Sequence, residues 1–254
     1  MMNSNFSTSG VFRLKHPRYL LISFLLFIVY NGYAQNFGQF GTGVFVYDGS
    51  NVLYKVSGSI NTTEDFLTAT SLGSFDAGSS TLLLKGARLL TWKNSGAGGN
   101  VCGGTLHYVI YPTGIRPDPI TFSSIALGWN QNCPGSAFTT GESCGGEDQQ
   151  WQNDGESIDL TPYAPGDYTL EVYVSFTGSD AGGCGTTRYD NNSGSNYTAE
   201  FTINAIDPVT SFSATADASV GHEEIDLSWA LNGYSDEVIV VASTVQSPDD
   251  LTQG

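Results

Sequence analysis

The clearest pattern in the chain is the alternation of apolar and polar residues from Tyr168 to Phe176. Every second residue is apolar, which is typical of a β-strand that buries one face. The preceding Pro165-Gly166 pair favours a tight turn, because proline fixes φ and glycine accepts positive φ. The pattern therefore predicts a turn followed by a central strand that packs on a hydrophobic core.

Shorter segments with strand character recur before and after this strand. The first two flank Asp48-Gly49-Ser50-Asn51, which favours a hairpin turn. These first two strands are 44–47 and 52–56, and the later ones, apart from the central strand, are 80–93, 105–111, 120–129 and 196–204. No helical periodicity appears after residue 34, and the 31 glycines with few charges are typical of all-β proteins. We therefore predict an all-β domain over residues 35–205.

The turn at 165–166 and the tyrosine that follows it resemble the E–F corner of immunoglobulin-like sandwiches. In that corner a tyrosine hydroxyl bonds to backbone a few residues upstream. The resemblance rests on LTPYAPGDYTLEVYVSF at 160–176. It implies an immunoglobulin-like antiparallel β-sandwich with strands running alternately up and down. The long loops 93–104, 130–156 and 177–195 would then gather at one end.

A second module is predicted over residues 206–254. Three strands are expected there, at 209–215, 224–229 and 237–242. The segment EIDLSW, residues 224–229, resembles the second strand of a fibronectin type III domain with its core tryptophan. A complete module of that type has about 100 residues. We therefore expect 206–254 to be an incomplete fibronectin type III-like module.

The whole chain also resembles secreted multi-domain proteins of the Bacteroidota type. The residues that carry this resemblance are Ala34-Gln35, TWKN at 91–94, PGDYTLEVY at 165–173 and IDLSW at 225–229. In such proteins a β-sandwich precedes a fibronectin-like module. The resemblance implies a secreted or cell-surface location and says little about activity.

The first 34 residues read as a signal peptide. Arg13, Lys15 and Arg18 precede an apolar segment at 20–29, and Gly32-Tyr33-Ala34 supplies the small residues before a cleavage site. We expect cleavage after Ala34 and no membrane insertion afterwards; the alternative is an uncleaved anchor. The chain's formal net charge of −16 disfavours nucleic acid as a partner.

All four cysteines, Cys102, Cys133, Cys144 and Cys184, follow the signal peptide. An even number in an oxidising compartment favours two disulfides, with three possible connectivities. Cys133 and Cys144 would close a short ring. In an immunoglobulin-like arrangement, Cys102 and Cys184 would pair across the loops beside neighbouring strands. Metal binding by the cysteines is disfavoured, because no C-x-x-C pair occurs.

The sequence offers no convincing catalytic centre. Residues 141–145 match G-x-S-x-G, but the strand and helix that a nucleophile elbow requires are missing. The acidic loop contains Glu147, Asp148, Asp154 and Glu156, which could hold a structural calcium ion or form a solvated surface. We expect no other cofactor.

Three aromatic residues are candidate ligand contacts: Trp129, Trp151 and Tyr163. The alternative for each tryptophan is a place in the core, which we also expect for Trp92. The sequence thus predicts a non-catalytic, secreted or cell-surface binding or adhesion module for an extracellular protein or glycan. The alternatives are an accessory module, carbohydrate-binding for example, of a larger extracellular hydrolase, or a catalytic sandwich.

Overall fold

The computed structural model describes residues 35–66, 71–78, 81–205, 210–217 and 224–230. The predicted signal peptide and the predicted strand at 237–242 lie outside these residues. Regular structure in the described part is β-strand, apart from two short 3-10 turns, η1 (Ser95–Ala97) and η2 (Asn192–Gly194). The prediction of an all-β protein is confirmed. No helix of the described part has the length and apolar character needed to cross a membrane.

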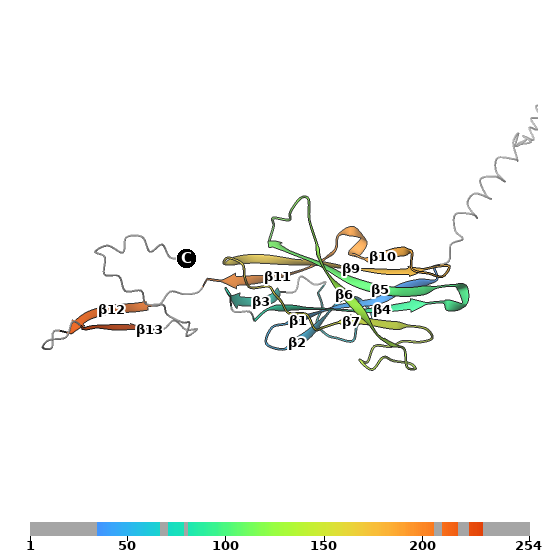
Figure 1. The fold of residues 1–254 in the computed structure, drawn as a ribbon, viewed down its shortest axis with the longest axis horizontal. Helices are drawn as coiled ribbons and strands as arrows, with labels where there is room; N and C mark the ends of the chain where they lie inside the picture. Colours follow the sequence, from blue (N-terminus) through green and yellow to red (C-terminus); the bar gives the residue numbers. More distant parts are fainter. Residues whose placement is uncertain (1–34, 67–70, 79–80, 206–209, 218–223, 231–254) are drawn as a thin grey trace, which may run out of the picture.

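Eleven strands form one sheet that curls back on itself (Figure 1). We call its first half sheet A. It contains, in spatial order, β2 (Asn51–Gly58), β1 (Phe37–Tyr47), β4 (Leu83–Lys93) and β7 (Gln149–Asn153). The short β8 (Ile158–Asp159) pairs with the beginning of β4.

The second half, sheet B, faces sheet A. It contains β5 (Asn100–Pro112), β9 (Gly166–Ser179), β11 (Tyr197–Asn204) and β3 (Ser71–Asp76), with β10 (Thr186–Asp190) beside the end of β9. The pairings are antiparallel except that of β3 with β11, which is parallel. The central predicted strand, β9, thus pairs with β5 along one edge and with β11 and β10 along the other.

One strand, β6 (Ser123–Asn132), belongs to both halves. Residues 123–127 pair with β5 of sheet B, whereas residues 128–132 pair with β7 of sheet A. The sandwich is therefore joined along β6, and its sheet is a curled half-barrel. An immunoglobulin domain instead has two separate sheets.

The core lies between the two halves of the curled sheet. Leu170, Val172, Val174 and Phe176 of β9 point into it and are at most 3% exposed. This is the face that the alternation predicts. The corner before β9 also has the expected bond, because the Tyr168 hydroxyl donates to the carbonyl oxygen of Ala164 at 2.8 Å.

Opposite β6, the edges of the two sheets meet through side chains. We call this the seam. The buried carboxylate of Asp190 accepts hydrogen bonds from Ser57 of β2 at 2.5 Å and from the Tyr197 hydroxyl at 2.6 Å. Burial, reinforced by the bond to Asp190, raises the pKa of Tyr197 to about 12. Arg188 of β10 also donates to the backbone carbonyl of Phe37 in β1.

Two further strands, β12 (Thr210–Asp217) and β13 (Glu224–Ala230), form an antiparallel two-stranded sheet. They coincide with the strands predicted at 209–215 and 224–229. The remaining residues of the predicted second module lie outside the described part of the chain.

Candidate ligand-binding groove

A groove of about 530 Å³ lies along the seam, where the beginning of β1 faces β10. Aromatic, amide and guanidinium side chains line it together. The lining residues are Gln35, Gly38, Gln39, Trp92, Phe176, Arg188, Tyr189 and Asn191.

The indole of Trp92 lies across the backbone of β1. Trp92 is paired with Gly38 in the sheet, and a Cβ added to Gly38 would lie only 2.6 Å from the indole nitrogen. The missing side chain therefore allows the ring to lie close to the strand. The ring is partly exposed and lines the groove, so the expectation that Trp92 fills the core is wrong.

Arg188 supplies a guanidinium group whose position is fixed from three sides. The central carbon of its guanidinium group, Cζ, lies 4.0 Å from the centre of the Phe37 ring, a favourable cation–π distance. One guanidinium nitrogen forms an ion pair with Asp180 at 2.7 Å, and the other donates to the Phe37 carbonyl. The groove is thus lined by a cation whose charge is already compensated.

Gln39 adds a polar atom with no partner. Its side-chain oxygen is buried and accepts no hydrogen bond from the described residues. Leaving a buried polar group unpaired costs about 1–3 kcal/mol. Gln39 is therefore a residue that lines the groove and whose amide is incompletely satisfied by the described residues.

Tyr189 connects the groove to the outer face of sheet B. Its side chain is 58% exposed, and its ring centre lies 6.3 Å from that of Tyr173. Tyr173 stacks on His107 at 4.4 Å and meets the edge of Phe122 at 4.9 Å. We call these four residues the aromatic cluster.

His107 is a neutral member of this cluster. Burial lowers the pKa of its imidazole, and its Nε2 lies 2.8 Å from the Ser175 hydroxyl. At neutral pH the cluster therefore presents uncharged rings next to hydroxyl groups.

The disulfide between Cys102 and Cys184 holds the segment that positions Arg188. The segment contains Asp180, which accepts a hydrogen bond from the backbone nitrogen of Asn36 at 2.7 Å. The groove is therefore supported by a covalent link between β5 and this segment.

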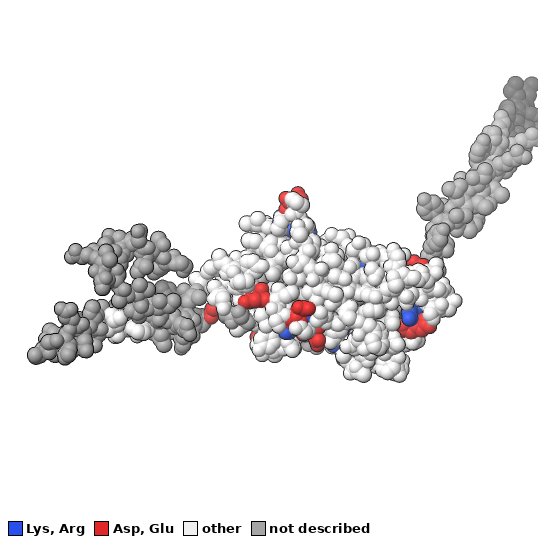
Figure 2. All heavy atoms as spheres, in the orientation of Figure 1, with Lys and Arg blue, Asp and Glu red and all other residues white. Residues whose placement is uncertain are grey.

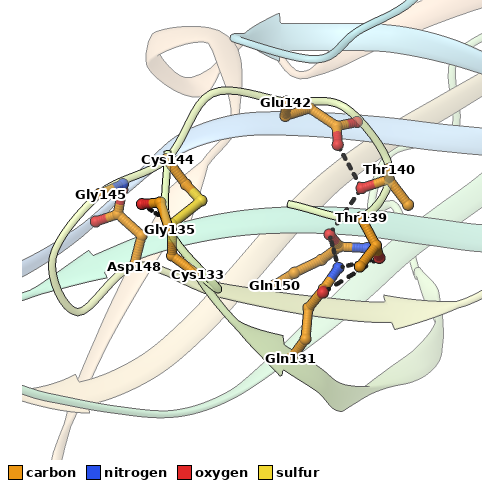
Figure 3. The surroundings of a disulfide bond; sticks show 10 residues. All are labelled: Gln131, Cys133, Gly135, Thr139, Thr140, Glu142, Cys144, Gly145, Asp148 and Gln150. Atoms are coloured by element: carbon orange, nitrogen blue, oxygen red, sulfur yellow. Dashed lines mark hydrogen bonds between the residues drawn. A yellow bond between two sulfur atoms is a disulfide. The ribbon is translucent and has the colours of Figure 1, made fainter. Parts of the chain in front are cut away.

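The second disulfide, between Cys133 and Cys144, closes a loop over the outer face of sheet A (Figure 3). Both pairs match the pairing that sequence analysis predicts. Phe138 of this loop packs on Ile60 and Leu90. The loop therefore covers the sheet, whereas the sequence predicts a loop at one end of the sandwich.

Glu142 anchors the same loop. It forms a buried ion pair with Arg88 of β4 at 2.6 Å and accepts a hydrogen bond from Thr140 at 2.5 Å. Removing one partner of a buried pair is strongly destabilising, because the other charge is left uncompensated. The G-x-S-x-G match thus contains a structural glutamate and a disulfide cysteine.

The three aromatic candidates from the sequence do not line the groove. Trp151 is 8% exposed, and its indole nitrogen donates to the Thr91 hydroxyl at 3.2 Å. Of the two places considered for it, Trp151 therefore occupies the core and is not a ligand contact. Trp129, opposite Trp151 in the sheet, is 56% exposed. Tyr163 is 37% exposed, and its ring centre lies 5.1 Å from that of Tyr168.

The four carboxylates proposed for calcium are not brought together. Glu147 accepts from the backbone nitrogen of Ser95, and Asp148 from that of Gly145, whereas Asp154 and Glu156 accept from the side-chain amides of Gln152 and Asn153. The hydrogen bonds from Ser95 lower the pKa of Glu147. Among the described residues, no three His, Cys, Asp or Glu residues are arranged to hold a metal ion.

Comparison of the chain with protein-family models, curated proteins and solved structures finds no match. The groove is therefore interpreted from its own geometry. Sequence analysis missed Gln39, Arg188 and Tyr189 as site residues. Only the pairing of β10 with β9 and the closure of the seam bring them together.

Proposed function

We propose that residues 35–205 form an extracellular, non-catalytic binding module that recognises neutral glycans through the groove. The observation that carries this proposal is the combination of two accessible aromatic rings, Trp92 and Tyr189, with the amides of Gln35 and Gln39. Sugars have apolar faces that pack on aromatic rings and hydroxyls that bond to fixed polar groups.

The charges in and around the groove favour a neutral ligand. Asp180 compensates Arg188, so no free cation is offered to an anionic group. The net charge of −16 repels polyanions. Most of the surface that the described residues present in Figure 2 is uncharged, and the charged side chains visible there form small separate groups. The lining residues include no carboxylate, histidine or cysteine, which supports binding rather than catalysis.

The extracellular location is supported by the two disulfides, which persist in oxidising compartments. The Tyr168 corner is shared with immunoglobulin-like sandwiches and supports a relation to such recognition modules. The fibronectin type III-like character of 206–254 and cleavage after Ala34 are part of the same proposal.

Calorimetric titration with β-1,4-linked hexasaccharides of glucose, xylose and N-acetylglucosamine tests the function. We expect at least one of them to bind, and Tyr189→Ala to weaken its affinity about tenfold, or about 1.4 kcal/mol. Trp129→Ala removes another exposed aromatic outside the groove and should change the affinity less than twofold. Absence of binding, or equal losses in both variants, would contradict the proposal.

A further inference from the structure

Gln35 lines the groove and is also the residue that follows the predicted signal-peptide cleavage site. We propose that cleavage before Gln35 completes the groove, and that the new terminal glutamine cyclises to pyroglutamate and forms part of its wall. This inference rests on the proposed function, because it assigns a maturation step to the same site.

The position of Gln35 is fixed by the residue after it. The Asn36 backbone nitrogen donates to the Asp180 carboxylate at 2.7 Å, and its side-chain amide donates to the Asp180 carbonyl at 2.8 Å. The Asn36 carbonyl accepts a hydrogen bond from the backbone nitrogen of Asn94 at 2.8 Å. Because Asn36 is held on three sides, the main chain must enter the domain beside the groove.

This entry point gives cleavage a direct effect on the groove. In the uncleaved chain, the backbone nitrogen of Gln35, a residue that lines the groove, is bonded to Ala34 and cannot cyclise. Cleavage of that bond leaves an α-amino group. That group has a pKa of about 7.7–8.0 and is mostly cationic at pH 7, in a groove that Arg188 also lines.

Cyclisation removes this second cation. The α-amino nitrogen of Gln35 attacks the side-chain amide carbon, and a new carbon–nitrogen bond closes a five-membered lactam. The bond from that carbon to the side-chain nitrogen breaks, and the nitrogen leaves as ammonia with the proton released by the amine. The step needs no oxidant or cofactor. The product is a flat, neutral ring with one N–H donor and one carbonyl acceptor, which suits a neutral glycan.

Mass spectrometry of chain secreted by a host that processes the signal peptide tests the modification. We expect the N-terminal peptide to begin at residue 35 with a mass one ammonia below that of the glutamine form. An N-terminus elsewhere, or a Gln35 that stays open in the secreted chain, would overturn the inference.

Titration with the same three hexasaccharides tests the role of the new terminus. The chain that begins at cyclised Gln35 should bind about tenfold more tightly than a chain that retains Tyr33 and Ala34. A control with two residues added after Gly254 should bind like the mature chain, and the three forms should melt at the same temperature. Equal affinity of mature and extended chains would refute the inference. If no form binds any hexasaccharide, the proposed function fails, whereas the mass measurement still decides the cyclisation.

Discussion

Gly38 decides the shape of the groove, because its missing side chain makes room for the indole of Trp92. The φ angle of Gly38 lies outside the left-handed region that favours glycine. Substitution by alanine would therefore not strain the backbone and would act only through the contact with the ring.

Gly38→Ala should weaken glycan binding about tenfold. The added Cβ would lie 2.6 Å from the indole nitrogen, so the ring must move away from β1 and change the groove. Gly128→Ala is the matched control, because the nearest atom to its added Cβ is 3.8 Å away. Titration of both variants with the hexasaccharide that binds the parent chain best gives the comparison. Unchanged affinity of Gly38→Ala would show that the indole position is unimportant.

The tryptophans show how far single residues can be assigned from the sequence. Alternation indicates which residues share a face of a strand, but it does not indicate what covers that face. The sequence places Trp151 in a loop, because its neighbours Gln149 and Gln150 are polar. In the structure both glutamines are buried. Gln150 is covered by the disulfide loop, whose Thr140 hydroxyl donates to its side-chain oxygen at 3.0 Å, a contact that local sequence does not reveal.

Among the strands, β9 has a polar face that is covered by the segment after β5. Glu171 accepts hydrogen bonds from the Tyr111 hydroxyl at 2.8 Å, from two Arg116 nitrogens at 2.8 Å each, and from the Asn196 amide at 2.6 Å. Burial alone would raise the pKa of Glu171, but these bonds outweigh it and lower the pKa. Thr169, on the same face, is 6% exposed, although alternation places it on the polar face.

Glu171→Gln should therefore lower stability at neutral pH by about 2–3 kcal/mol, because hydrogen bonds to a charged group are lost. A carboxylate with a lowered folded-state pKa stabilises the protein above its unfolded-state pKa, and this contribution is lost as the pH falls through the folded-state value. The difference between parent and variant should thus shrink between pH 7 and pH 3 in urea denaturation.

Glu200→Gln is the control for this pH dependence, since Glu200 is an exposed residue on the neighbouring β11. Its stability should follow that of the parent within about 0.5 kcal/mol. A Glu171 variant whose deficit stayed constant from pH 7 to pH 3 would contradict the role given to the ionised carboxylate.

Across the whole molecule, the two disulfides differ in the length of chain that they close. Cys102 and Cys184 are 82 positions apart, and Cys133 and Cys144 are 11 apart. Restricting the unfolded chain contributes about 4.5 kcal/mol for the longer ring and about 2.8 kcal/mol for the shorter one. The first bond also holds the segment with Asp180, so it is coupled to the groove.

Replacing Cys102 and Cys184 together by serine should destabilise the domain more than replacing Cys133 and Cys144. It should also weaken glycan binding, whereas the second pair of substitutions should leave binding unchanged. Urea denaturation and hexasaccharide titration of both double variants provide the measurements. The reverse order of stability would contradict the entropic argument.

The sequence predicts the all-β class of the fold better than it predicts how the sheet curls and closes at the seam. The alternation in β9 and the turn at Pro165-Gly166 follow from local preferences. The change of partner along β6 and the parallel pairing of β3 with β11 depend on contacts between distant segments. The groove exists only because the sheet closes at the seam, so its residues could not be recognised one by one.

The placement of the two ends of the domain has a mechanical consequence. Strand β1 begins at one end of the sandwich, and β11 finishes at the other (Figure 1). Each is paired on both edges, β1 with β2 and β4, and β11 with β9 and β3. Tension applied between these ends acts along both strands, so their ladder bonds are loaded in shear and must break together. A domain tethered at both ends would therefore need a higher force for mechanical unfolding than a domain whose terminal strands lose their ladder bonds one after another.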